Sequence, residues 1–188
     1  MTVQIYLPDS EPGPEPAVTA PSPAALAGLR IAVLDNGKPN ADVVMTALAE
    51  SLAARTGAEV ALVTKKGPHG LSANAAIPVA EDRLELVCDS ADLVITGAAD
   101  CGSCTAYSVV DAITLERRGK PTVVTTTTNF KPVAETLSKS FGAPDTRLLV
   151  MPHPIGGTDA DTLGRWAEAS TDALIALFTG ATTVAGQV

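Results

Sequence analysis

The chain has 188 residues, of which 46% are hydrophobic and 18% charged, a composition typical of a globular protein with a substantial core. The net charge of −8 argues against nucleic acid or an anionic membrane as a partner, because either would require a basic face. Three cysteines, an odd number, do not make a disulfide framework. No apolar run reaches the length of a membrane span, and no signal peptide is evident. We therefore expect a cytoplasmic protein with reduced thiols.

Residues 1–28 are expected to form an N-terminal arm. Residues 1–7 alternate weakly and suit a short strand, whereas residues 8–23 contain six prolines. Such a composition buries too little apolar surface to fold alone. Two interpretations stay open, an arm laid on a neighbouring molecule and plain disorder. Residues 29–180 are expected to form a single domain, and residues 181–188 a tail.

Strand-like and helix-like patterns alternate along that domain. Apolar or β-branched runs predict strands at 29–34, 59–64, 91–96, 122–127 and 147–151. Helical periodicity and end signals predict helices between Asn40 as N-cap and Gly57, at 81–89, 103–118 and 132–141, and from 158 or 159 onward. The alternation predicts a three-layer α/β domain with a five-stranded, mostly parallel sheet. We expect a flavodoxin-like or Rossmann-like fold with strand order 2-1-3-4-5.

Polar residues follow every one of the predicted strands. Because parallel strands end at one edge of a sheet, and ligands of α/β proteins bind outside those carboxyl ends, this edge is the predicted site. His69 follows the second strand in a lysine-rich loop. The candidate substrate-binding residues are Asn36, Lys38, Asn40, Ser103, Thr105, Thr128 and Asn129.

The most informative motif is Cys-Gly-Ser-Cys at residues 101–104, where a strand passes into a helix. Free N–H groups and the helix dipole at such a position stabilise a thiolate. The spacing lets Cys101 and Cys104 either share a disulfide or cooperate as attacking and resolving thiols. Cys101 lies nearer the strand end and is the expected attacking sulfur. Structural or metal-binding cysteines are the alternative.

Two further residues are candidates for proton transfer. His153 lies between two prolines, which restrict the backbone and suit a general acid or base. Asp100, next to Cys101, is a candidate base. A zinc site made of Cys101, Cys104 and His153 would lack an evident fourth ligand, so neither a metal nor a cofactor is predicted.

Several linked motifs carry a resemblance to a known family. They comprise residues 34–42, 100–105, 119–122 and 152–154, together with Ser108, residues 111–113 and residues 115–116. This pattern resembles the UGSC family of (seleno)proteins, over about residues 29–157. In that family the first position of the Cys-Gly-Ser-Cys box can be selenocysteine, which implies that Cys101 carries the reactive atom.

These features favour a thiol-dependent enzyme that acts on a small-molecule substrate. Cys101 would attack, Cys104 would resolve or assist, and His153 or Asp100 would move the proton. Reductive use would form a Cys101–Cys104 disulfide that an external thiol reductant recycles. The alternatives are a non-redox lyase, hydratase or hydrolase, and a non-catalytic ligand-binding or metal-binding subunit of a larger complex. We also expect a homodimer or higher homo-oligomer, with a partner enzyme as a further alternative.

Overall fold

The structure is a computed structural model that describes residues 19–68 and 74–181. His69 and the strand expected at residues 1–7 lie outside the described residues. Within them, strands and helices alternate in the order β1 (Arg30–Asp35), α1 (Ala41–Thr56), β2 (Glu59–Lys65), α2 (Glu81–Ser90), β3 (Leu93–Ala99), α3 (Gly102–Arg117), β4 (Thr122–Thr127), α4 (Lys131–Ser140), β5 (Arg147–Met151) and α5 (Ala160–Thr179). None of the described helices has the length and apolarity needed to cross a membrane.

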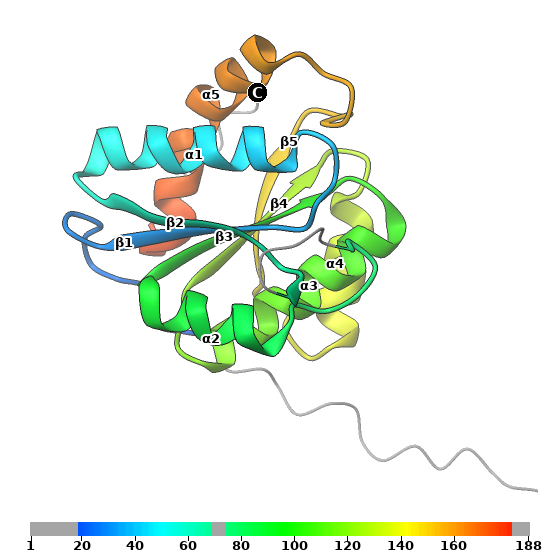
Figure 1. Ribbon diagram of the computed structural model, residues 1–188, viewed down its shortest axis with the longest axis horizontal. Helices are drawn as coiled ribbons and strands as arrows, with labels where there is room; N and C mark the ends of the chain where they lie inside the picture. Colours follow the sequence, from blue (N-terminus) through cyan, green and yellow to red (C-terminus); the bar gives the residue numbers. More distant parts are fainter. Residues whose placement is uncertain (1–18, 69–73, 182–188) are drawn as a thin grey trace, which may run out of the picture.

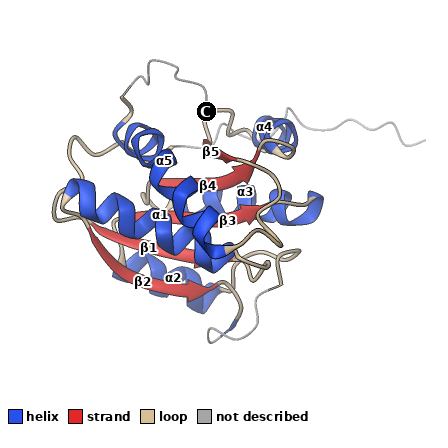
Figure 2. Cartoon of the chain, turned by 90° about the horizontal axis from the view of Figure 1, so that it is seen from above, coloured by secondary structure: helices blue, strands red, loops and turns tan. Residues whose placement is uncertain are grey.

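The strands form one parallel sheet in the order β2-β1-β3-β4-β5 (Figure 2). Helices α1 and α5 pack together on one face, and α2, α3 and α4 cover the other (Figure 1). The predicted three-layer α/β architecture and the flavodoxin-like strand order are confirmed. The parallel sheet follows from the alternating pattern, since a helix between two strands returns the chain so that both strands run in the same direction.

The core lies on both faces of the central strands. Every residue of β3 and of β4 is buried. One apolar cluster joins the sheet to α1 and α5, and a second lies between the sheet and α2. Each fully buried Leu, Ile or Val side chain contributes about 1.5–3 kcal/mol of transfer free energy. This burial explains why the middle strands read as continuous apolar or threonine-rich runs.

Strand β3 ends three residues later than predicted, at Ala99 instead of Thr96. Its last part passes through Gly97, which has a φ of 142° and whose missing Cβ would lie 2.8 Å from Thr125 O. Only glycine fits this close approach in that conformation. The pairing of β3 with β4 shifts between Gly97 and Ala99, and the strand delivers residues 100–104 directly to the sheet edge.

Asn40 is the N-cap of helix α1, as predicted, but its side chain does not cap the helix. Asn40 has a left-handed φ of 65° and makes no side-chain cap hydrogen bond. Its Nδ2 instead donates to Ile155 O at 3.0 Å and to Thr158 O at 2.8 Å. These two bonds orient the Asn40 side chain toward the β5–α5 loop.

The described part of the N-terminal arm packs on its own domain. Ala20 and Leu26 are 3% and 4% exposed, and Ala20 N donates to Glu116 Oε2 at 2.6 Å. Residues 19–28 therefore belong to the folded unit at the amino-terminal edge of the sheet. Residues 1–18 of the arm and 182–188 of the tail lie outside the described residues.

Candidate active site

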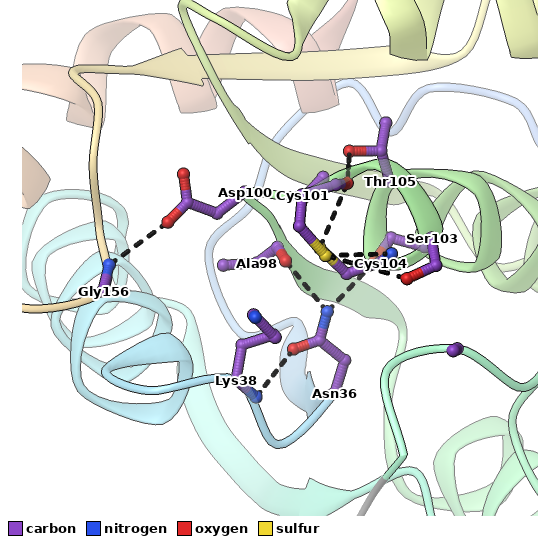
Figure 3. The surroundings of a disulfide bond; sticks show 12 residues. Asn36, Lys38, Ala98, Asp100, Cys101, Ser103, Cys104, Thr105 and Gly156 are labelled. Atoms are coloured by element: carbon purple, nitrogen blue, oxygen red, sulfur yellow. Dashed lines mark hydrogen bonds between the residues drawn. A yellow bond between two sulfur atoms is a disulfide. The ribbon is translucent and has the colours of Figure 1, made fainter.

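The Cys-Gly-Ser-Cys box begins helix α3 (Figure 3). Cys101 is the N-cap, in extended conformation, and its Sγ accepts the Cys104 N–H at 3.3 Å. Its carbonyl oxygen accepts the Thr105 N–H at 2.9 Å and the Thr105 hydroxyl at 2.5 Å. Cys101 and Cys104 form a disulfide with their Cα atoms 5.4 Å apart. The first cysteine thus performs the capping role that Ser, Thr or Asp usually fills.

The two sulfur-bearing residues differ in accessibility. Cys101 is half-exposed, whereas Cys104 is 0% exposed. Cys104 Sγ lies 3.2 Å from Cys101 O, a contact that becomes a hydrogen bond when the sulfur is reduced to a thiol. Ser103 is exposed, with its hydroxyl 3.8 Å from Cys101 Sγ. A small molecule that approaches this edge therefore meets Cys101 first.

Asp100 joins the cysteine box to the loop that follows β5. Its Oδ1 lies 2.7 Å from His153 Nδ1, and its Oδ2 accepts the backbone N–H groups of Ile155 and Gly156, each at 3.2 Å. Consecutive Cα atoms are about 3.8 Å apart, so a path of about 10 Å joins the Cα of Cys101 to the imidazole. The carboxylate therefore brings His153 to the neighbourhood of the cysteines.

The imidazole has two further neighbours. Thr127 Oγ1, at the end of β4, lies 3.2 Å from His153 Nδ1, and the Phe130 ring lies 5.8 Å from the imidazole ring. The His153 side chain is 28% exposed, so it keeps an accessible edge. Thr127 ends strand β4, and Phe130 follows that strand.

Asn36 and Lys38 occupy the loop after β1, beside the cysteine box in Figure 3. Asn36 is fully buried, and its Nδ2 donates to Ala98 O at 2.9 Å and approaches Ser108 Oγ at 3.4 Å. Its Oδ1 accepts the Lys38 N–H at 3.2 Å. The Lys38 ammonium pairs with no carboxylate among the described residues. Asn36 thus connects the loop after β1 with strand β3 and helix α3.

The remaining predicted site residues, Thr128, Asn129 and Asn40, lie at the same edge but make no hydrogen bond to one another. Thr128 and Asn129 follow β4, are exposed, and make no side-chain hydrogen bond within the described part of the chain. The Asn40 amide is occupied by the β5–α5 loop. The structure therefore brings together Asn36 with Lys38, the two cysteines with Ser103 and Thr105, and Asp100 with His153.

A fully buried ion pair at this edge was missed from the sequence. Lys66 Nζ lies 2.9 Å from Asp111 Oδ2, and the two side chains are 0% and 1% exposed. Val79 N donates to the other carboxylate oxygen at 2.8 Å, and the ammonium lies 5.7 Å from the Tyr107 ring. Burial raises the pKa of Asp111, and the charge of Lys66 opposes that rise. The only signal for this polar cluster in the sequence was that Asp111 follows Ser108 by three residues, so that both lie on one face of the predicted helix.

A recess of about 260 Å³ lies beside the edge strand β2. It is lined by Asp35, Asp42, Val63, Thr64 and Lys65, and none of the predicted site residues contributes. Burial raises the pKa of Asp35, which lies 3.9 Å from the Lys65 ammonium. The chemistry-bearing side chains, and not this recess, define the candidate site. Across residues 19–68 and 74–181, no three His, Cys, Asp or Glu side chains cluster closely enough to hold a metal ion.

The family of this chain is shown by its similarity to known proteins. A model of the UGSC family matches residues 4–180. The chain belongs to the UGSC family. This match confirms the resemblance drawn from the linked motifs of the sequence.

No curated protein matches this member of the UGSC family. One similar solved structure is that of a short-chain flavodoxin associated with a non-canonical PDU bacterial microcompartment. It is 13% identical, has a TM-score of 0.42, and the match covers 77% of this chain and 98% of that one. The strand order, and not this likeness, establishes the fold of the present chain.

Proposed function

We propose that this UGSC protein is a thiol-dependent enzyme that acts on a small metabolite through Cys101. The observation that carries the proposal is the asymmetry of the box, with an accessible sulfur at the helix N-cap and a buried sulfur joined to it. The N–H groups of the first helical turn and the helix dipole stabilise negative charge at Cys101. Such an environment lowers the pKa of a thiol and produces a nucleophile.

In the reductive cycle, the Cys101 thiolate attacks an electrophilic atom of the substrate, forms a covalent bond to it and displaces a leaving group, which departs with its bonding electron pair. The Cys104 thiolate then attacks Cys101 Sγ, so that the S–S bond forms and the substrate group leaves with the bonding electron pair and a proton. Two thiols are oxidised and the substrate gains two electrons. An external thiol restores the enzyme by attacking the disulfide at the accessible Cys101 sulfur, and a second equivalent releases Cys101.

Lys38 suits a substrate that carries negative charge near the reacting atom. Its ammonium is free of carboxylate partners in the described residues, and its backbone is held by the buried Asn36. A carboxylate or phosphate group of the metabolite would therefore gain an ion pair without displacing a protein one.

The Asp100–His153 contact favours a second candidate function. A base beside a nucleophilic cysteine is typical of acyl-transfer, addition and elimination reactions, in which no disulfide forms. In that case the protein is a lyase, hydratase or hydrolase, and Cys104 is dispensable for turnover.

The first test compares the reactivity of the three thiols in the reduced protein. Iodoacetamide at neutral pH should label Cys101 much faster than Cys104, with sites assigned by mass spectrometry of peptides. Cys88 serves as an internal control, because it is a free thiol whose pKa is raised mainly by burial. Equal labelling of Cys101 and Cys88 would contradict the assignment of the nucleophile.

The second test separates the redox function from the non-redox function. Reduced wild-type protein mixed with glutathione disulfide should form the Cys101–Cys104 disulfide, whereas the Cys104→Ser variant should stop at a glutathione adduct on Cys101. The Cys101→Ser variant should form neither product. A wild-type protein that keeps the adduct shows that Cys104 does not resolve it, and leaves the lyase, hydratase or hydrolase.

We also propose that the protein is a homo-oligomer. Light scattering of the full chain should report at least twice the monomer mass. A monomeric mass would contradict it.

A further inference from the structure

The environment of Asp100 specifies what its carboxylate does. Its side chain is 9% exposed, and the buried Oδ1 makes no well-aligned hydrogen bond among the described residues. The His153 Nδ1 atom, at 2.7 Å, is the neighbour that faces it. A carboxylate only accepts hydrogen bonds, so the nitrogen that faces it must carry a proton. Two lone pairs at that distance would repel each other.

The second carboxylate oxygen is also occupied. Oδ2 accepts the N–H groups of Ile155 and Gly156, which anchors the loop that contains His153. In Figure 3 the carboxylate points toward Gly156 and away from the Cys101 sulfur. Asp100 is therefore adjacent to Cys101 in the chain while its charge is directed to the β5–α5 loop. This geometry does not suit Asp100 as the base that deprotonates Cys101.

Resting on the function proposed above, we propose that Asp100 is a positioning residue that holds His153 as the Nδ1–H tautomer, so that Nε2 exchanges the proton at the site. Thr127 Oγ1, 3.2 Å from the same nitrogen, is a second positioning residue. The two groups occupy one edge of the imidazole, and Nε2 belongs to the other. Because the side chain is 28% exposed, a substrate can reach that free edge. A hydrogen bond at one ring nitrogen decides which nitrogen is basic.

The test reads the tautomer directly by nitrogen-15 NMR of the histidine side chains in the reduced, full-length protein. The chain has two histidines, so a His69→Gln variant assigns the signals. Wild-type His153 should show a protonated Nδ1 and an unprotonated Nε2 above the pH at which the ring becomes neutral. The Asp100→Asn variant should lose this preference and show a mixture of tautomers, and Thr127→Val should change it in the same direction by less.

The matched control is Asp159→Asn, the same substitution in the same loop. Asp159 caps α5 through the Thr162 N–H and has no contact with His153, so its variant should keep the wild-type tautomer. Circular dichroism checks that each variant folds. If Asp100→Asn fails to fold, the wild-type spectrum alone still decides, because an Nε2–H tautomer overturns the proposal.

An unchanged tautomer in a folded Asp100→Asn variant would also overturn the positioning role. The measurement uses no substrate and no cysteine chemistry. It therefore stays interpretable if Cys101 proves not to be the nucleophile, and the two proposals fail separately.

Discussion

Among the described residues, a fully paired arginine at one end of the sheet contrasts with an unpaired lysine at the other. At the amino-terminal edge, Arg147 and Glu116 are each less than a tenth exposed, and every guanidinium nitrogen donates a hydrogen bond within the described residues. At the carboxyl edge, the Lys38 ammonium has no carboxylate partner in the described residues and one edge of the His153 ring is accessible. A buried, fully paired network stabilises a fold, whereas unpaired groups at an edge are available to a ligand.

The amino-terminal network explains why part of the proline-rich arm is folded. The Arg147 guanidinium pairs with Glu116 and also donates to Ala20 O, at 2.8 Å, and to Ser22 Oγ, at 3.1 Å. Its Nε donates to Leu177 O at 3.0 Å. One side chain therefore joins β5, α3, the arm and the end of α5. Residues 19–28 are therefore attached at the end of the sheet opposite to the candidate active site.

The largest effect should come from Arg147→Met. Removing one partner of a buried ion pair leaves Glu116 uncompensated, which costs about 3–5 kcal/mol of the free energy of unfolding. Urea denaturation measures this loss, and iodoacetamide labelling of Cys101 should stay unchanged in the folded variant. The control is Glu135→Gln, which breaks the exposed ion pair with Lys131 and should have a much smaller effect. Equal losses in the two variants would contradict the contrast between the buried and the exposed pair.

Lys66→Met tests the fully buried Lys66–Asp111 ion pair at the carboxyl edge. We expect a loss of about 2–3 kcal/mol at neutral pH, smaller than for Arg147→Met because Asp111 can take up a proton. Burial raises the pKa of Asp111, so its protonated form favours folding, and that contribution disappears as the pH rises through the folded-state pKa. Without Lys66 the rise is larger, so the stability of the variant should fall more with increasing pH than that of the wild type.

The measurement for Lys66→Met is urea denaturation at a mildly acidic and a mildly alkaline pH. Lys65→Met is the matched control, since its side chain is 46% exposed and lies 3.9 Å from Asp35. The adjacent lysine should change stability little. A pH dependence identical to that of the wild type would show that Lys66 does not set the ionisation of Asp111.

The smallest effect concerns Lys38, the unpaired charge of the carboxyl edge. Lys38→Met should lower the rate of Cys101 alkylation by anionic iodoacetate relative to neutral iodoacetamide by a small factor, because the attraction between charges in water is weak. Lys139→Met, on α4, is the control and should leave the ratio unchanged. A Lys38→Met ratio equal to that of the wild type would remove Lys38 from the substrate-binding set.

The edge of the sheet that holds the candidate site could be predicted from the sequence, because this edge depends only on the direction of the strands. Parallel strands end together, so polar residues after each strand identify one edge without any knowledge of side-chain packing. The location of the Cys-Gly-Ser-Cys box between a strand and a helix was likewise evident from the passage of an apolar run into a helical pattern. The Asp100–His153 contact was out of reach, because 53 residues separate the partners and no local pattern links them.

Two neighbouring lysines show most clearly what could not be predicted from the sequence. Lys65 and Lys66 look equally solvated in a Lys-Lys-Gly-Pro run, yet one is half-exposed and the other is 0% exposed. Their difference depends on where β2 ends and on the position of Asp111 on a distant helix. The Asn40 side chain illustrates the same point, since its Nδ2 donates to loop carbonyls more than 100 residues away in the chain.

For this protein the sequence by itself determined the order of elements, the parallel sheet and the edge where the candidate site residues gather, because periodicity and strand direction are local properties. Only the tertiary structure decided which sulfur is accessible, which charges are paired and which nitrogen of His153 faces a carboxylate. Those properties depend on desolvation and on hydrogen-bond distances between segments far apart in the chain, and neither quantity is encoded in any single window of residues.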